Sequence, residues 1–235
     1  MQLKTILFDL DGTLLPLDQD FFIKKYFESL NLYLAKAGLD RESVGGAVIK
    51  GTFAMMENDG KCKNEELFWK VYEKTAGRKR ASDEPLLEHF YTVEFQELRN
   101  FCGRDPEAKR TVDFLREKGF RLVLATNPVF PRYATESRVR WAGLSPDDFE
   151  YLTTYENSSY AKPKEGYYEE ILHTLDIKPE ECLMVGNDVV DDMVAKNVGM
   201  NVFLMTDCLL NREGRDVSEY PKGNWKDLRD FTEFF

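Results

Sequence analysis

Three short apolar runs of the chain each end in a pair of polar side chains that are able to do chemistry. The three pairs are Asp9 and Asp11, Thr126 and Asn127, and Asn187 and Asp188. Carboxylates can attack an electrophile, exchange protons or hold a cation, and hydroxyl and amide groups can bind the oxygens of an anion. Each pair alone is also typical of a turn. The pairs indicate a site only if the fold brings them together.

The alternation of strand and helix patterns predicts such a fold. The expected strands cover residues 3–8, 121–125, 182–185 and 201–205. From residue 105 onward, the expected helices cover residues 105–118, 132–142, 166–175 and 188–197. The connections are long enough for parallel pairing, so we expect an α/β fold with a doubly wound, Rossmann-like parallel sheet. Ligands bind at the carboxyl ends of the strands in such sheets, which is where the three pairs lie.

Helical patterns alone occupy the segment between the first two expected strands. They predict helices over residues 21–37, 44–57, 65–76 and 86–101. In the first of these, large apolar side chains recur every three or four residues and share one face: Phe22, Tyr26, Leu30 and Tyr33. We expect this face to be the core of a helical bundle, and a ligand-binding surface is the less favoured alternative.

Composition excludes several classes of function. The chain has 32 basic and 42 acidic residues, a net charge of −10, which disfavours nucleic acid as a partner. The basic cluster at residues 78–80 is expected to be a solvated turn. No apolar run is long enough for a membrane span, no leader pattern is present, and the four cysteines lack zinc-binding spacing, so a cytoplasmic protein with reduced thiols is expected.

The polar pairs belong to longer motifs that resemble the signatures of the haloacid dehalogenase-like (HAD) hydrolase superfamily, whose members are mostly phosphatases. The motifs, in the family's order, are Asp9-Leu10-Asp11-Gly12-Thr13, Leu-Ala-Thr-Asn at 124–127, Ala-Lys-Pro at 161–163 and Val-Gly-Asn-Asp-Val-Val-Asp-Asp at 185–192. The helical insertion is similar to the family's mobile cap. The resemblance therefore implies a catalytic core of residues 1–15 and 98–235 and a cap of residues 16–97, with hinges near residues 15–18 and 100–105.

The resemblance implies a Mg²⁺-dependent hydrolase of small organic phosphate monoesters. Asp9 is the implied nucleophile, which forms an aspartyl-phosphate, and Asp11 is the implied general acid and base. Thr126 and Lys162 are implied catalytic residues that also bind the phosphate, together with Asn127. The partner is thus expected to be a small-molecule organic phosphate, and the oligomeric state is left open.

The resemblance also implies a Mg²⁺ site made by Asp9, the backbone carbonyl of Asp11 and Asp188. The fourth motif departs from the family here, because Asn187 directly follows the glycine where an aspartate is common. Asp188 is preferred as the ligand because of its charge, with Asn187 as a neutral ligand or an outer partner. Asp192, one helical turn later, is expected to orient Asp188 or Lys162.

Asp11 also discriminates between the activities of the superfamily. Dehalogenases and phosphonate hydrolases lack an aspartate at that position, so a phosphatase is favoured. A phosphomutase would keep both Asp9 and Asp11 and a helical cap, and it remains an alternative. A non-catalytic binding or regulatory protein on the same fold is the less favoured alternative from a different class.

Overall fold

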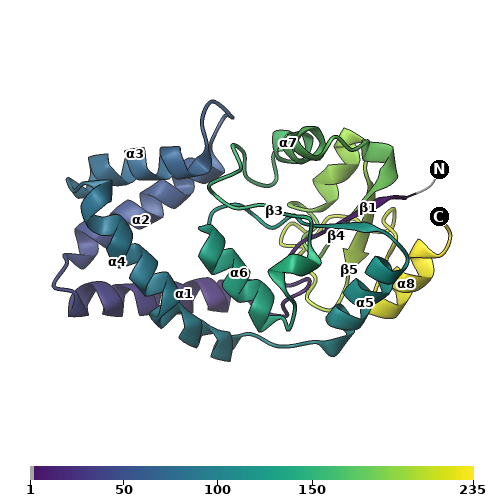
Figure 1. Cartoon of the computed structure of the whole chain (residues 1–235), viewed down its shortest axis with the longest axis horizontal. Helices are drawn as coiled ribbons and strands as arrows, with labels where there is room; N and C mark the ends of the chain where they lie inside the picture. The colour runs from purple at the N-terminus through teal and green to yellow at the C-terminus, as the bar shows by residue number, and fades with distance from the viewer. Residues whose placement is uncertain (1–2) are drawn as a thin grey trace.

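The computed structural model describes residues 3–235. A parallel sheet lies at one end of the molecule (Figure 1). Within those residues, six strands pair in the order β3-β2-β1-β4-β5-β6. They are β1 (Thr5–Phe8), β2 (Arg121–Leu124), β3 (Tyr151–Leu152), β4 (Cys182–Gly186), β5 (Asn201–Met205) and β6 (Lys222–Gly223). Every pairing is parallel, which confirms the predicted α/β fold and the four predicted strands.

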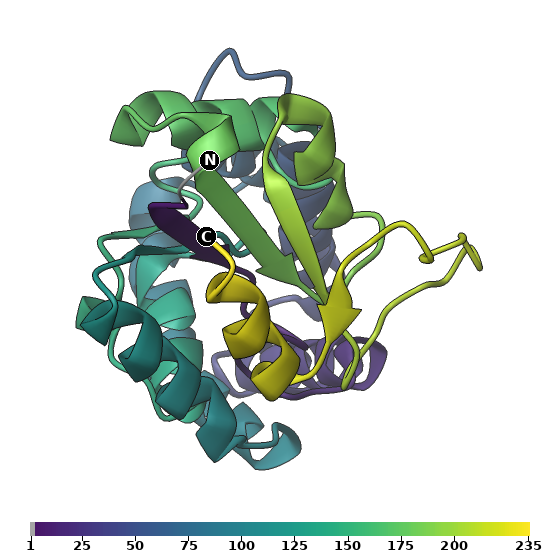
Figure 2. The ribbon, with the colours of Figure 1, turned by 90° about the vertical axis from the view of Figure 1, so that its right-hand side faces the viewer.

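Helices cover both faces of this sheet, as Figure 2 shows. One face carries α5 (Pro106–Glu117) and α8 (Trp225–Thr232), and the other carries α7 (Glu165–Leu175) and the 3-10 helix η4 (Met193–Val198). Successive side chains of a strand point to opposite faces. Ile6 and Phe8 of β1 accordingly join the core under α5 and α8, and Leu7 joins the core under α7. The sheet is therefore doubly wound, as expected.

The helices between β1 and α5 lie together at the other end of the molecule (Figure 1). They are α1 (Gln19–Lys36), α2 (Arg41–Met56), α3 (Asn64–Ala76), α4 (Arg80–Thr92) and the 3-10 helix η1 (Glu94–Phe101). The Asp18 and Asp40 carboxylates cap α1 and α2 by accepting from backbone N–H groups of the first turn. The aromatic stripe of α1 is buried in the core of this helical insertion, as expected.

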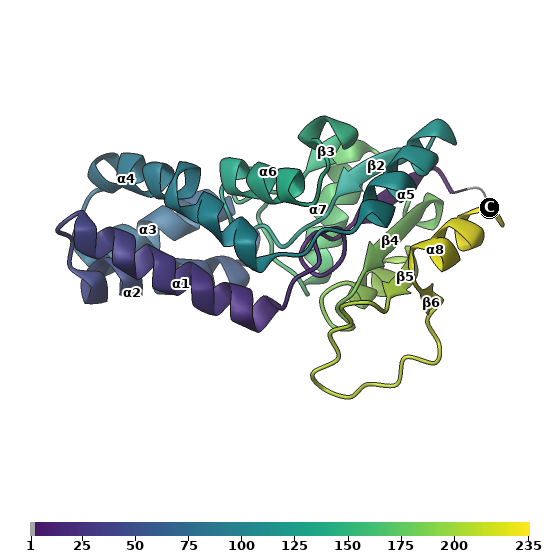
Figure 3. The ribbon, with the colours of Figure 1, turned by 90° about the horizontal axis from the view of Figure 1, so that it is seen from below.

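The remaining helical segments belong to the sheet's half of the molecule. They are α6 (Arg132–Trp141) and the short 3-10 helices η2 (Pro146–Asp148) and η3 (Pro179–Glu181). Residues 206–221 form a long connection that projects from the sheet between β5 and β6 (Figure 3). None of the helices within residues 3–235 has the length and apolar composition needed to cross a membrane.

Three local predictions are wrong. The predicted single helix over residues 86–101 is two elements, α4 and η1, because the Gln96 side chain donates to the Tyr91 carbonyl where the next helical bond would form. The predicted helix over residues 188–197 is replaced by turns and η4. The Asn187 carbonyl and the Val189 N–H pair with Leu210 of the connection after β5, so the backbone leaves β4 in a bridge to that connection before it turns.

The third correction concerns the basic cluster at residues 78–80, which is not a simple solvated turn. Arg78 pairs with the buried Asp83 carboxylate at 2.6 Å, and Arg80 begins α4 and pairs with Glu84 at 2.6 Å. Arg78 thus ties the turn to α4, and Arg80 joins α4 to α3 through a second ion pair with Glu65.

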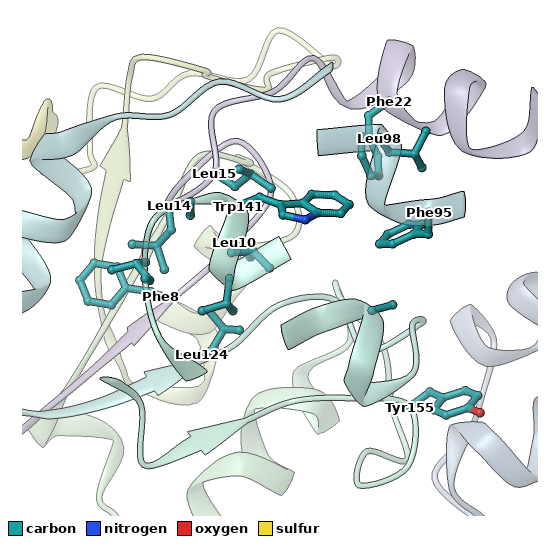
Figure 4. Close-up of a cluster of buried hydrophobic side chains, with 14 of the residues drawn as sticks. Phe8, Leu10, Leu14, Leu15, Phe22, Phe95, Leu98, Leu124, Trp141 and Tyr155 are labelled. Carbon is teal, nitrogen blue, oxygen red and sulfur yellow. The ribbon is translucent and has the colours of Figure 1, made fainter. Parts of the chain in front are cut away.

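The insertion is joined to the sheet by two neighbouring segments. The N–H of Gly103 donates to the carbonyl of Pro16 over 2.6 Å, so the outgoing and returning chains lie side by side at the expected hinges. A continuous apolar cluster runs from Phe8 of the sheet through Trp141 to Phe95 of the insertion (Figure 4). The Phe95 and Trp141 rings lie 5.1 Å apart, so the two halves share a packed core.

Candidate active site

The carboxyl ends of three neighbouring strands bring the predicted site residues into one cavity of about 40 Å³. Central β1 lies between β2 and β4, and the polar segments that follow these strands line the cavity. Its lining is Asp9, Asp11, Gln19, Thr126, Asn127, Lys162, Asn187, Asp188, Asp191 and Asp192. Every site residue predicted from the sequence is among them, and Gln19 and Asp191 are additional.

Lys162 connects two carboxylates at the floor of this cavity. Its Nζ donates to Asp9 Oδ1 over 2.8 Å and to Asp192 Oδ1 over 2.6 Å, and the lysine side chain is 1% exposed. Burial alone would lower the pKa of Lys162, but the charges of Asp192 and Asp9 hold it well above its ordinary value. Lys162 is therefore a fixed ammonium ion beside Asp9.

The loop after β4 is shaped around Asp192. Its Oδ2 accepts from the Asp188 N–H over 2.9 Å, while its other oxygen holds Lys162. A Cβ atom at Gly186 would lie 2.1 Å from Asp192 Oδ2, so only glycine fits there. Asp192 thus orients both Lys162 and the backbone at Asp188, the two roles that were predicted as alternatives.

Asn187 uses both ends of its side-chain amide to hold neighbouring loops. Its Oδ1 accepts from the Thr13 hydroxyl over 3.0 Å, and its Nδ2 donates to the Cys208 carbonyl over 2.7 Å. Gly12 has φ +88°, and a Cβ there would lie 2.4 Å from Asn187 Nδ2. Because its amide is already committed, Asn187 fits the part of an outer partner better than that of a metal ligand.

Asp11 is held by an arginine that the sequence reasoning missed. Arg138 of α6 is 1% exposed, donates to Asp11 Oδ2 and lies over the Phe130 ring, with its Cζ 4.4 Å from the ring centroid. Burial raises the pKa of Asp11, against the opposing charge of Arg138. The sequence signal that could have identified Arg138 is its helical spacing, which places it on the buried face of α6 with Thr135 and Val139.

Thr126 and Asn127 form the wall of the cavity that follows β2. The Thr126 carbonyl accepts from the Thr153 hydroxyl over 2.7 Å and from the Tyr167 hydroxyl over 2.9 Å, which fixes the backbone. Asn127 Oδ1 is buried without a hydrogen-bond partner among the described residues. Both side chains are thus available to a ligand in the cavity.

The cavity has an excess of negative charge that suits a divalent cation. Five carboxylates line it, against Lys162 and the Arg138 that contacts Asp11. Burial and the charge of Asp188 raise the pKa of Asp191 to about 6. Within residues 3–235, no three His, Cys, Asp or Glu side chains converge into a metal cage of their own. Mg²⁺ fits such a site because it needs only one or two protein carboxylates and keeps several waters.

The chain belongs to the haloacid dehalogenase-like hydrolases, because the model of that family matches residues 3–199. It is a phosphatase-type member by its curated relatives. The pyrophosphatase PpaX of Anoxybacillus flavithermus is 27% identical over 201 residues, which cover 85% of this chain and 81% of that protein. The non-catalytic alternative is therefore set aside.

Solved structures of the same fold cover nearly the whole chain. The HAD hydrolase YfnB of Bacillus subtilis, bound to magnesium, has a TM-score of 0.56 at 19% identity over 99% of both chains. A 2-haloacid dehalogenase of Pseudomonas syringae has a TM-score of 0.63 at 19% identity over 100% of both chains. At these identities the likeness shows the fold, and the reaction must be argued from the site.

Proposed function

We propose that the protein is a Mg²⁺-dependent phosphatase of small-molecule phosphate monoesters that works through an aspartyl-phosphate on Asp9. The observation that carries this proposal is the 2.8 Å contact between Lys162 and Asp9 inside a cavity rich in carboxylates. The contact holds one oxygen of Asp9 and leaves its other oxygen for attack. It also places a positive charge where a phosphate oxygen would lie.

The residues divide the hydrolysis into two steps. The Asp9 carboxylate attacks phosphorus, the bond from phosphorus to the ester oxygen breaks, and Asp11 gives its proton to the departing oxygen. Water then attacks the phosphorus of the aspartyl-phosphate and loses a proton to Asp11, and the bond from phosphorus to Asp9 breaks. This releases phosphate, restores the Asp9 carboxylate and returns Asp11 to its protonated form. Thr126, Asn127 and Lys162 hold the phosphate oxygens during both steps.

Mg²⁺ would be held by Asp9, the backbone carbonyl of Asp11 and Asp188. When bound, it neutralises the charge on the phosphate and on the neighbouring carboxylates. We assign residues 16–97 to a cap over this site and residues 1–15 and 98–235 to the catalytic core. The position of Gln19 in the wall of the catalytic cavity supports this division.

The test is release of inorganic phosphate from a panel of phosphate monoesters, with pyrophosphate included because of the PpaX relatives. We expect hydrolysis that requires Mg²⁺ and falls at least about 10⁴-fold in kcat in Asp9→Asn, because the nucleophile is lost. Asp20→Asn is the control, since Asp20 is an exposed partner of Arg212 outside the cavity.

Two results would contradict the proposal. Full turnover by Asp9→Asn would show that Asp9 is not the nucleophile. Turnover without any divalent metal would show that the reaction does not need the Mg²⁺ site. Conversion of a sugar phosphate to its isomer without release of phosphate would identify a phosphomutase instead.

A further inference from the structure

A second cavity of about 180 Å³ adjoins the catalytic cavity on the side of the helical insertion. The two share Asp11, Gln19 and Asn127 in their walls, so the second begins where the phosphate's ester oxygen would meet Asp11. Its volume is comparable to a cavity of about 150 Å³ that accepts benzene. It therefore has room for an organic group of about one ring.

The walls of the second cavity are mostly apolar. Phe22, Ile23 and Phe27 come from α1, Met56 comes from α2, and Phe130 comes from the loop after β2. Tyr26 also lines it, but its hydroxyl is bonded to the Tyr91 hydroxyl over 2.7 Å. The α1 stripe thus serves both as bundle core and as the wall of a cavity.

The lining offers little to a second charged group. Arg138 is the one cationic side chain among the lining residues described, and its guanidinium already contacts Asp11 and lies on the Phe130 ring. A phosphate leaving group would bring at least one further negative charge into these apolar walls, which is costly without a partner. An apolar group would gain from burial there.

We propose that this cavity binds the organic part of the substrate, and that the substrates are phosphate monoesters with an apolar group of about one ring rather than pyrophosphate or a highly hydroxylated ester. This inference rests on the proposed function, because the group enters the cavity as the leaving group of the ester that Asp9 attacks. The inference gives this chain a different substrate from pyrophosphate, the substrate named for its PpaX relatives.

The first measurement compares kcat/KM for benzyl phosphate, glycerol 3-phosphate and pyrophosphate. The two esters have alkyl leaving groups, so intrinsic reactivity does not favour the benzyl ester. We expect benzyl phosphate to exceed both others by at least about tenfold. Equal or lower efficiency for benzyl phosphate, with either of the others hydrolysed, would overturn the inference and leave the hydrolysis standing.

A pair of variants on α1 tests the wall itself. Ile23→Asp places a carboxylate at the cavity, and we expect it to lower kcat/KM for benzyl phosphate about tenfold while glycerol 3-phosphate changes less than about twofold. Leu32→Asp is the control, since Leu32 is also an exposed apolar residue of α1 but lies outside the cavity. An equal loss for both esters in Ile23→Asp would contradict the assignment.

A binding measurement separates the two proposals. Benzylphosphonate and methylphosphonate cannot be hydrolysed, and calorimetry gives their Kd values in the presence of Mg²⁺. We expect benzylphosphonate to bind at least about tenfold more tightly, with the difference lost in Ile23→Asp. This preference without turnover of any ester would refute the hydrolysis alone, and equal Kd values would refute the cavity assignment.

Discussion

Asp188 and Asn187 are neighbours in the loop after β4, yet their side chains have different surroundings. We expect Asp188→Ala to raise the Mg²⁺ concentration for half-maximal activity at least about tenfold, because a charged ligand is lost. Asn187→Ala should act mainly on stability, since its amide joins Thr13 to Cys208. Mg²⁺ titrations and denaturant unfolding of both variants check this. The reverse pattern, with metal affinity lost only in Asn187→Ala, would make Asn187 the ligand.

The three polar pairs of the candidate site could be predicted because they follow strands closely, whereas Lys162 and Asp192 were predicted from the resemblance to the HAD motifs. Asp9, Thr126 and Asp188 are each placed by where a buried run stops, and parallel strands bring those stops together. Arg138 could not be predicted in the same way. It lies in mid-helix, and its contact with Asp11 depends on how α6 packs against the sheet, which no local pattern specifies.

At the scale of the elements, Asp83 of α4 bonds to α3 and to the turn between the two helices, and its contribution to stability depends on pH. It is 1% exposed and accepts from Arg78 and from the Tyr72 hydroxyl. Burial raises the pKa of Asp83, but these hydrogen bonds outweigh it and hold the pKa below its ordinary value. A lowered folded-state pKa stabilises the protein above the unfolded-state pKa of about 4, and the stabilisation is lost as the pH falls through the folded-state pKa.

We therefore expect Asp83→Asn to lower the free energy of unfolding by about 1–2 kcal/mol at neutral pH, a value reduced by the partial exposure of Arg78. The difference from the wild type should be constant above about pH 5 and shrink below about pH 4. Urea unfolding across this range measures it. A difference that grows as the pH falls would contradict the role given to Asp83.

Helices and strands could be predicted where their apolar residues recur with a regular spacing. Long strands and helices such as β4 and α7 were found, while β3 and β6, at two residues each, are too short to show alternation. The turns and η4 after β4 replace a predicted helix where the backbone of residues 187–189 pairs with Leu210. A contact between segments far apart in the chain is invisible to a local hydrophobic pattern.

At the scale of the whole molecule, the insertion is held against the sheet's half by Asn64 at the start of α3. This residue is fully buried, its N–H donates to Ser158 over 2.8 Å, and its Nδ2 donates to the carbonyls of Pro128 and Tyr160 at 3.2 Å each. We expect Asn64→Ala to cost about 1–3 kcal/mol of unfolding free energy, because two buried carbonyls lose a donor.

Hydrogen exchange and urea unfolding test this contact. Exchange should become faster at residues 58–64 and 157–160, where the two halves meet. Asp59→Ala is the control, because Asp59 is an exposed residue of the same loop that pairs with Lys61. Unchanged exchange and unchanged stability in Asn64→Ala would show that other contacts hold the halves together.

The hydrogen bond between Gly103 and Pro16 means that the chain leaves the sheet and comes back at almost the same point. A helical unit of another length or sequence can be grafted between these two positions without stretching the strands. Under the proposed function, the inserted length of chain supplies most of the wall that would meet the alcohol, and the sheet's half supplies the residues that would meet the phosphate.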